Sequence, residues 1–120
     1  MKVAFTTAGS DLDAPLDSRF GRAPRFLVYD LESETFEAVD NRRSIDAARG
    51  AGIQSAETVA RLGVKSVVTG NCGPKAFRVL SAAGIRIFTT DAATVAEALE
   101  RFRSSRLVEA RSPNVEGYWA

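Results

Sequence analysis

The chain has 120 residues, of which 45% are apolar and 26% charged, and its formal net charge is +1. This length suits one domain, and the composition is that of a globular protein, which excludes a disordered or collagen-like chain. The near-zero net charge excludes a whole-molecule field that would attract nucleic acid or an anionic membrane, so any electrostatic function must be local.

Three strands are predicted in the first third of the chain. Residues 2–7 form the first strand, and residues 25–31 and 35–40 form two more, separated by a Glu-Ser-Glu turn of hairpin length. Residues 11–24 are rich in turn formers and charged side chains, which predicts a long surface loop. Loops of this length are usually functional or disordered.

Helices and strands alternate in the next part of the chain. A second loop at residues 41–52 precedes apolar residues at helical spacing, which predicts a helix that ends near Gly63. Residues 64–69 predict a buried strand. Residues 74–83 predict a second helix, which tolerates a proline in its first turn and has Gly84 as its C-terminal cap.

The last predicted elements are a short strand and a third helix. The strand covers residues 85–88, and Asp91 is the predicted cap of the helix that follows it. Residues 104–120 show no clear period. We therefore predict a single domain over residues 1–120, with a core at 1–105 and a C-terminal tail.

The element order β-β-β-α-β-α-β-α predicts an α/β fold. A meander followed by right-handed parallel crossovers gives one five-stranded mixed sheet of order 3-2-1-4-5, with strand 2 antiparallel and about three helices. This is the order of ribonuclease H-like folds. Enzymes of that type hold two metal ions with carboxylates, but the predicted strands 2–7 and 64–69 contain no Asp or Glu, so nuclease activity does not follow.

Two residue types that often carry chemistry are scarce. Cys72 is the single cysteine, so the chain can form no intrachain disulfide and no thiolate-only metal cage. Histidine is absent, which removes the usual near-neutral general base and the commonest metal ligand. The chain begins with a strand-like run, and no apolar run approaches the roughly 20 residues of a membrane span, so we expect a cytoplasmic protein.

The turn before the second helix is a candidate binding site. Ligands of open sheets collect outside the carboxyl ends of parallel strands, where this turn is expected to meet residues 7–10 and 89–91. A helix start offers free backbone N–H groups and the positive end of the helix dipole to an anion. Glycines would allow close backbone approach. The turn consists of Gly70, Asn71, Cys72 and Gly73.

Cations are expected to surround this turn. The long loop supplies Arg19, Arg22 and Arg25, and Lys75 lies in the first turn of the helix, an unusual place for a cation unless an anion is near. An alternative interpretation makes the arginines solvated loop charges. In that case their partners would be Asp11, Asp13 and Asp17.

Cys72 also has two interpretations. It is either a small buried hydrophobe, or a ligand or reactive thiol, because a helix start lowers the thiol pKa. Cys72 and Arg78 form a Cys-x5-Arg pattern between a strand and a helix, the topology of phosphatase and rhodanese loops. Pro74 constrains that loop, and Val79 stands where such loops usually have a hydroxyl. A phosphate- or nucleotide-binding module with the same helix start is a further alternative.

Two segments carry a family resemblance. SRFGRAP at residues 18–24, followed by a strand, and GNCGPKAF at residues 70–77 resemble the paired signatures of the dinitrogenase iron-molybdenum cofactor biosynthesis family. The resemblance spans roughly residues 1–105. It implies a ribonuclease H-like fold and the binding or carriage of a metal-sulfur cluster.

The single-domain form and the tail sequence NVEGYW at residues 114–119 are similar to members of that family that hold a molybdenum-copper sulfide cluster noncovalently. An iron-molybdenum cofactor-like cluster is the alternative. Some members hold that cofactor with a histidine, which this chain lacks. The resemblance implies a carrier and not an enzyme. We expect a monomer or weak dimer that exchanges the cluster with a protein partner and binds neither nucleic acid nor membrane.

A cationic, glycine-lined pocket would suit such a cluster. A thiomolybdate-based cluster is a bulky, soft polyanion that needs positive groups, N–H donors and apolar walls more than covalent ligands. Phe20, more typical of a core residue, would form such a wall together with Ile53 and Phe77, and Cys72 is the candidate metal ligand. The predicted binding residues are Arg19, Phe20, Arg22, Gly70, Asn71, Cys72, Gly73 and Lys75.

Overall fold

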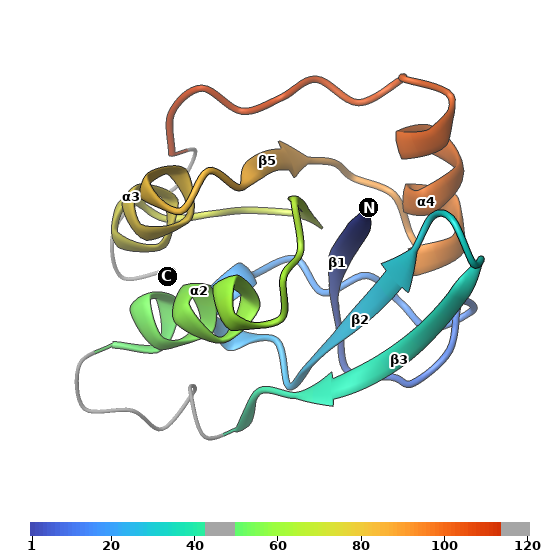
Figure 1. Ribbon diagram of the computed structural model, residues 1–120, viewed down its shortest axis with the longest axis horizontal. Coiled ribbons are helices and arrows are strands. Elements are labelled where there is room, and N and C mark those ends of the chain that lie inside the picture. Colours follow the sequence, from blue (N-terminus) through green and yellow to red (C-terminus); the bar gives the residue numbers. More distant parts are fainter. Residues whose placement is uncertain (43–49, 114–120) are drawn as a thin grey trace.

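The computed structural model describes residues 1–42 and 50–113 (Figure 1). The predicted strands and helices are present, together with one short 3-10 helix, η1, that the sequence patterns did not predict. None of the helices in this described part is long and apolar enough to span a membrane. The elements are β1 (Lys2–Thr7), η1 (Phe20–Arg22), β2 (Arg25–Asp30), β3 (Thr35–Asp40), α2 (Ala51–Arg61), β4 (Ser66–Thr69), α3 (Pro74–Ala82), β5 (Arg86–Thr89) and α4 (Val95–Arg103).

One mixed sheet holds the five strands in the order β3-β2-β1-β4-β5. β2 runs antiparallel to both β1 and β3, whereas β4 runs parallel to β1 and β5. The predicted strand order and directions are thereby confirmed. Because β1, β4 and β5 are parallel, their carboxyl ends lie at the same end of the sheet.

Helices cover both faces of the sheet, with α2 and α3 together on one face and α4 on the other (Figure 1). Side chains of successive strand residues point to opposite faces, so each strand contributes to two apolar layers. The layer under α2 and α3 contains Ala4, Phe26, Val28, Val67 and Ile87, and the layer under α4 contains Val3, Phe5, Leu27, Val68 and Phe88.

The predicted cap of α4 is wrong. Thr94, not Asp91, is the N-cap: its Oγ1 accepts the backbone N–H of Glu97 at 3.1 Å. The carboxylate of Glu97 in turn accepts the N–H of Ala93 at 3.0 Å, a reciprocal arrangement close to a capping box. The helix begins too far along the chain for the side chain of Asp91 to reach its first free N–H groups.

The second predicted loop is shorter than expected. Helix α2 begins at Ala51, inside the predicted loop of residues 41–52. Gly50 precedes it with φ +104°, a backbone conformation that side chains disfavour, which explains the glycine at this helix start. Residues 43–49 of that loop lie outside the described residues.

The chain after α4 returns along the outer edge of β5 (Figure 1). The N–H of Ala110 donates to the carbonyl of Ile87 at 2.7 Å, and Glu109 forms an antiparallel bridge with Phe88. Glu109 also pairs with Arg86 at 2.8 Å. The first part of the predicted tail therefore packs on the sheet, while residues 114–120 lie outside the described residues.

Candidate functional site

The long loop and the turn before α3 lie side by side at the carboxyl ends of β1 and β4. The N–H of Phe20 donates to the carbonyl of Asn71 at 3.1 Å, and the side-chain amide of Asn71 donates to the carbonyl of Ser18 at 2.9 Å. Arg19 and Asn71 form a parallel bridge. The structure thus joins the two segments that carry the family resemblance through their backbones.

Gly70 allows this close approach. A Cβ atom at this position would lie 2.7 Å from the Cα of Ser18 and 2.9 Å from its carbonyl oxygen, closer than carbon and oxygen atoms pack. Only glycine fits without moving the loop. The sequence predicts that the glycines of this turn let a ligand approach, but at Gly70 the backbone of Ser18 occupies that space.

Buried threonines attach the loop to the ends of the strands. The Oγ1 of Thr6 donates to the carbonyl of Asp17 at 2.7 Å and lies 2.9 Å from the Oγ1 of Thr69, and the N–H of Asp17 donates back to the carbonyl of Thr6 at 2.7 Å. The Oγ1 of Thr7 donates to the carbonyl of Pro15 at 2.8 Å. Sequence reasoning expected residues 7–10 at this place but missed Thr6 and Thr69, although hydroxyls at the ends of otherwise apolar strands were a visible signal.

The loop also uses the first N–H groups of α4. Those of Val95 and Ala96 donate to the carbonyls of Ala14 and Leu12 at 3.0 and 2.8 Å. The N–H of Leu16 donates to the carbonyl of Ala93 at 3.1 Å. The start of α4, which follows the expected site segment 89–91, therefore holds the loop and does not offer these donors to an anion.

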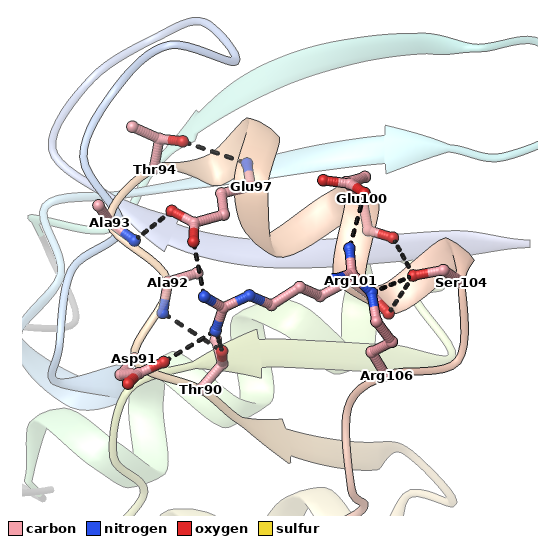
Figure 2. A network of polar contacts seen from close by, with 10 residues as sticks. All are labelled: Thr90, Asp91, Ala92, Ala93, Thr94, Glu97, Glu100, Arg101, Ser104 and Arg106. Atoms are coloured by element: carbon pink, nitrogen blue, oxygen red, sulfur yellow. Dashed lines mark hydrogen bonds and ion pairs between the residues drawn. The ribbon is translucent and has the colours of Figure 1, made fainter.

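Arg101 fixes the segment that leads into α4 (Figure 2). Its guanidinium donates to the Oγ1 of Thr90 at 3.1 Å, to the carboxylate of Asp91 at 2.8 Å and to Glu97 at 2.6 Å. The hydrogen bond and the charge of Arg101 hold the pKa of Asp91 below its ordinary value. Glu97 links this group to the N–H of Ala93, whose carbonyl holds the loop.

Three predicted binding residues have cationic side chains without a partner among the described residues. The side chains of Arg19, Arg22 and Lys75 are exposed, and within residues 1–42 and 50–113 they form no hydrogen bond or ion pair. Arg25 donates to the carbonyl of Ala8 at 3.2 Å. Positive charge is therefore available at η1 and at the start of α3.

The alternative pairing of the loop arginines with loop aspartates is not found among the described residues. The carboxylate of Asp17 accepts the backbone N–H of Arg19 at 2.9 Å, and that of Asp11 accepts the N–H of Asp13 at 3.0 Å. Arginines on the α4 side, by contrast, have carboxylate partners. These pairs are Arg86 with Glu109, Arg101 with Asp91 and Glu97, Arg103 with Glu34, and Arg106 with Glu100.

The start of α3 has backbone N–H groups that no described residue accepts. Gly73 is the N-cap and Pro74 the first helical residue, so the chain supplies no side-chain cap. The N–H groups of Gly73, Lys75 and Ala76 have no acceptor among the described residues, but Gly73 and Ala76 are buried and only Lys75 of these three is exposed. The positive end of the α3 dipole, with the N–H of Lys75, favours an anion at this helix start.

Cys72 lies in the core. Its side chain is 1% exposed, within the apolar layer that contains Phe20, Ala76 and Leu80. Burial raises the pKa of the thiol to about 12, so the neutral form persists at physiological pH. This placement favours the small buried hydrophobe over the reactive thiol or metal ligand. Arg78 is exposed on α3, so the Cys-x5-Arg pattern does not bring its two side chains into one open loop.

Phe20 also lies in the core. Its ring is 1% exposed and packs against Phe26, with 5.5 Å between the ring centroids. The ring therefore anchors η1 to the core. Direct contact between this ring and a ligand stays a prediction. Ile53 and Phe77, the other expected apolar walls, are half-buried.

Two surface hollows in the described part of the chain lie away from this site. One of 260 Å³ is lined by residues of β1, β2 and β3, among them Lys2 and Glu37. Another of 300 Å³ is lined by Arg86, Phe88 and residues near the end of α4. Within the described ranges, no group of three or more Cys, Asp or Glu side chains is placed to hold a metal ion.

Comparison with known proteins supplies a family. Residues 1–105 match the family model described as dinitrogenase iron-molybdenum cofactor. An uncharacterized protein from Methanocaldococcus jannaschii is 27% identical over 95 residues, which cover 77% of this chain and 80% of that protein.

Solved structures with similar sequences share the fold. The apo form of the orange protein from Desulfovibrio gigas is 40% identical, with a TM-score of 0.91, and the match covers 95% of this chain and 96% of that one. A NifB-like protein from Thermotoga is 35% identical, with a TM-score of 0.83 and coverage of 97% and 98%.

Proposed function

The chain belongs to the dinitrogenase iron-molybdenum cofactor family, and we propose that it binds and carries a molybdenum-containing metal-sulfur cluster of the molybdenum-copper sulfide type. The cluster is cargo that passes to or from a protein partner, and we propose no enzymatic reaction. The family and its orange protein relative support binding related to a metal cluster. The proposal includes a ribonuclease H-like fold, which the sheet order supports.

The observation that carries this proposal is the set of exposed cations at η1 and in the first turn of α3 that have no partner among the described residues. Arg19, Arg22 and Lys75 have no carboxylate partner among the described residues, and the first N–H groups of α3 have no acceptor there. An anion at this place would meet several attractions of about 1 kcal/mol each at the solvent-exposed surface. A polyanion can interact with several of these groups at once, whereas a single phosphate group can interact with fewer of them.

The buried thiol fits a cargo that brings its own sulfides. Cys72 lies in the core with a raised pKa, so it offers no thiolate at the surface. The chain contains no histidine. We therefore propose retention by charge and hydrogen bonds instead of covalent ligation. An iron-molybdenum cofactor-like cluster is the alternative cargo, and elemental analysis of protein isolated from its native host separates the two.

Tetrathiomolybdate with a copper salt is the probe that tests the proposal. The apo protein should retain a visible charge-transfer band through gel filtration, and excess ATP should not remove it. Displacement by ATP would instead support the alternative of a phosphate- or nucleotide-binding module.

Two triple variants of equal net charge sharpen this test. Replacing Arg19, Arg22 and Lys75 by Gln should weaken retention by roughly 10–100-fold, from about 0.5–1 kcal/mol per exposed contact. It should also flatten the dependence on salt, because screened attractions are lost. The matched control replaces Arg86, Arg103 and Arg106, which have carboxylate partners. Equal losses in both variants would contradict a local cationic site.

A further inference from the structure

We propose that Asn41 is a positioning residue of the candidate site, whose buried amide holds the end of η1 and thereby fixes the segment that carries Arg19 and Arg22. Sequence reasoning did not single out this residue, which directly follows β3. The inference rests on the proposed function, because it assigns a purpose to the placement of those two cations.

The side chain of Asn41 joins three parts of the fold. It is 1% exposed, and its Nδ2 donates to the carbonyl of Ala23 and to the Oγ of Ser55, both at 2.9 Å. Its backbone N–H donates to the carbonyl of Pro24 at 2.8 Å. Ala23 is the C-cap of η1 and Ser55 lies in α2. Asn41 therefore links η1, the end of β3 and α2.

This link is one downstream attachment of η1, next to the pairing of β2 with β3 that begins at Arg25 opposite Asp40. A single 3-10 turn has weak internal hydrogen bonding, so its position depends on its neighbours. Upstream, the N–H of Phe20 bonds to the carbonyl of Asn71. Downstream, the buried carbonyl of Ala23 depends on the amide of Asn41. The two ends of the segment 20–23, which contains Arg22, are thus held by two different parts of the fold: the turn before α3 at one end and Asn41 at the other.

Asparagine suits this position chemically. A buried amide is costly unless it is hydrogen-bonded, so its presence in the core indicates that its bonds are needed. An aspartate could not donate to the carbonyl of Ala23, and a serine has a shorter reach. Asn41 offers two N–H donors, and both have acceptors here.

Two variants separate the positioning bond from the rest of the link. Asn41→Ala removes the donor to Ala23, whereas Ser55→Ala removes the contact with α2 and leaves that donor in place. The first readout needs no cargo: it is the rate of tryptic cleavage after Arg22, an exposed residue of η1. We expect Asn41→Ala to accelerate this cleavage about tenfold, the effect of one lost buried hydrogen bond, and Ser55→Ala to change it much less.

The second readout is the cargo itself. Asn41→Ala should weaken retention of the tetrathiomolybdate-copper probe about tenfold and reduce the visible circular dichroism of the bound probe, with Ser55→Ala close to the unmodified protein. Gly84→Ala controls for lowered global stability, because this residue has φ +76° with open space around it and does not touch the loop. If Asn41→Ala does not fold, Asn41→Ser is measured in the same comparisons.

The outcomes separate this proposal from the proposed function. The positioning role would be overturned if the Asn41 variant had the same rate of tryptic cleavage and the same probe retention as Ser55→Ala or Gly84→Ala. Faster cleavage with unchanged retention would overturn it too. If the unmodified protein does not retain the probe, the proposed function fails, and the cleavage rates alone then decide whether Asn41 fixes η1.

Discussion

Replacing Gly70 by alanine should separate the two segments that form the candidate site. The new Cβ would lie 2.7 Å from the Cα of Ser18 and 2.9 Å from its oxygen. Contact distances between carbon atoms are about 3.5–4.0 Å, so one backbone must withdraw by roughly 0.8–1.3 Å. The bonds of 3.1 Å from Phe20 to Asn71 and 2.9 Å from Asn71 to Ser18 would then exceed hydrogen-bonding distance.

The expected cost combines overpacking and lost hydrogen bonds. Overpacking costs about 1–3 kcal/mol, and each lost bond about 1 kcal/mol, partly offset by movement of the loop. We expect the free energy of unfolding of Gly70→Ala to fall by about 2–3 kcal/mol. Probe retention should fall about tenfold, because Arg19 moves with Ser18. Denaturant unfolding and gel filtration of the loaded protein measure the two effects.

Gly63→Ala is the matched control for this prediction. Gly63 has φ +76° with nothing within 4 Å of an added Cβ, so the variant is strained by about 1–2 kcal/mol without a clash. It precedes β4, at the end of the sheet opposite the site. Retention should therefore stay unchanged. The reasoning is refuted if Gly70→Ala keeps its full stability and a protected Phe20 amide in hydrogen exchange.

Two further predictions concern titrating groups. Burial raises the pKa of Cys72 to about 12 from 9.0, so the folded state loses stability as pH rises above 9. Denaturation near pH 8 and pH 11 should show a loss of about 2–3 kcal/mol that Cys72→Ala lacks, with cargo retention unchanged in that variant. Arg101 lowers the pKa of Asp91, which contributes stability that is lost as pH falls through that lowered value. Arg101→Gln should remove this acid dependence. Thermal melting curves of this variant that match those of the unmodified protein at each pH down to 2 would contradict the assignment.

The sheet and its helices could be predicted because their signals are local. Strand alternation and helical spacing identify each element, and the crossover rules then leave few arrangements. The start of α4 could not be fixed in this way. Asp91 and Thr94 are both good caps, and the choice depends on Thr90, whose N–H continues the pairing of β5 with the carbonyl of Thr69 at 2.9 Å.

The site was predictable as a meeting of two segments but not in its side-chain details. Motif position places residues 18–24 near residues 70–77, and the structure joins them at Asn71. Which side chains face solvent depends on how the turn packs, so the burial of Cys72 could not be chosen over its exposure. The role of Gly70 depends on Ser18, a residue distant in sequence. The short helix η1 depends on similarly distant attachments.

The return of the chain along β5 has a consequence for where this domain physically ends. The family signature stops at residue 105, but the hydrogen bond from Ala110 to Ile87 comes after it. A chain truncated at the signature boundary would leave that side of the sheet uncovered. Open strand edges recruit other strands, so such a truncation would favour self-association. The smallest unit that resists self-association is therefore longer than residues 1–105, the stretch that matches the family model.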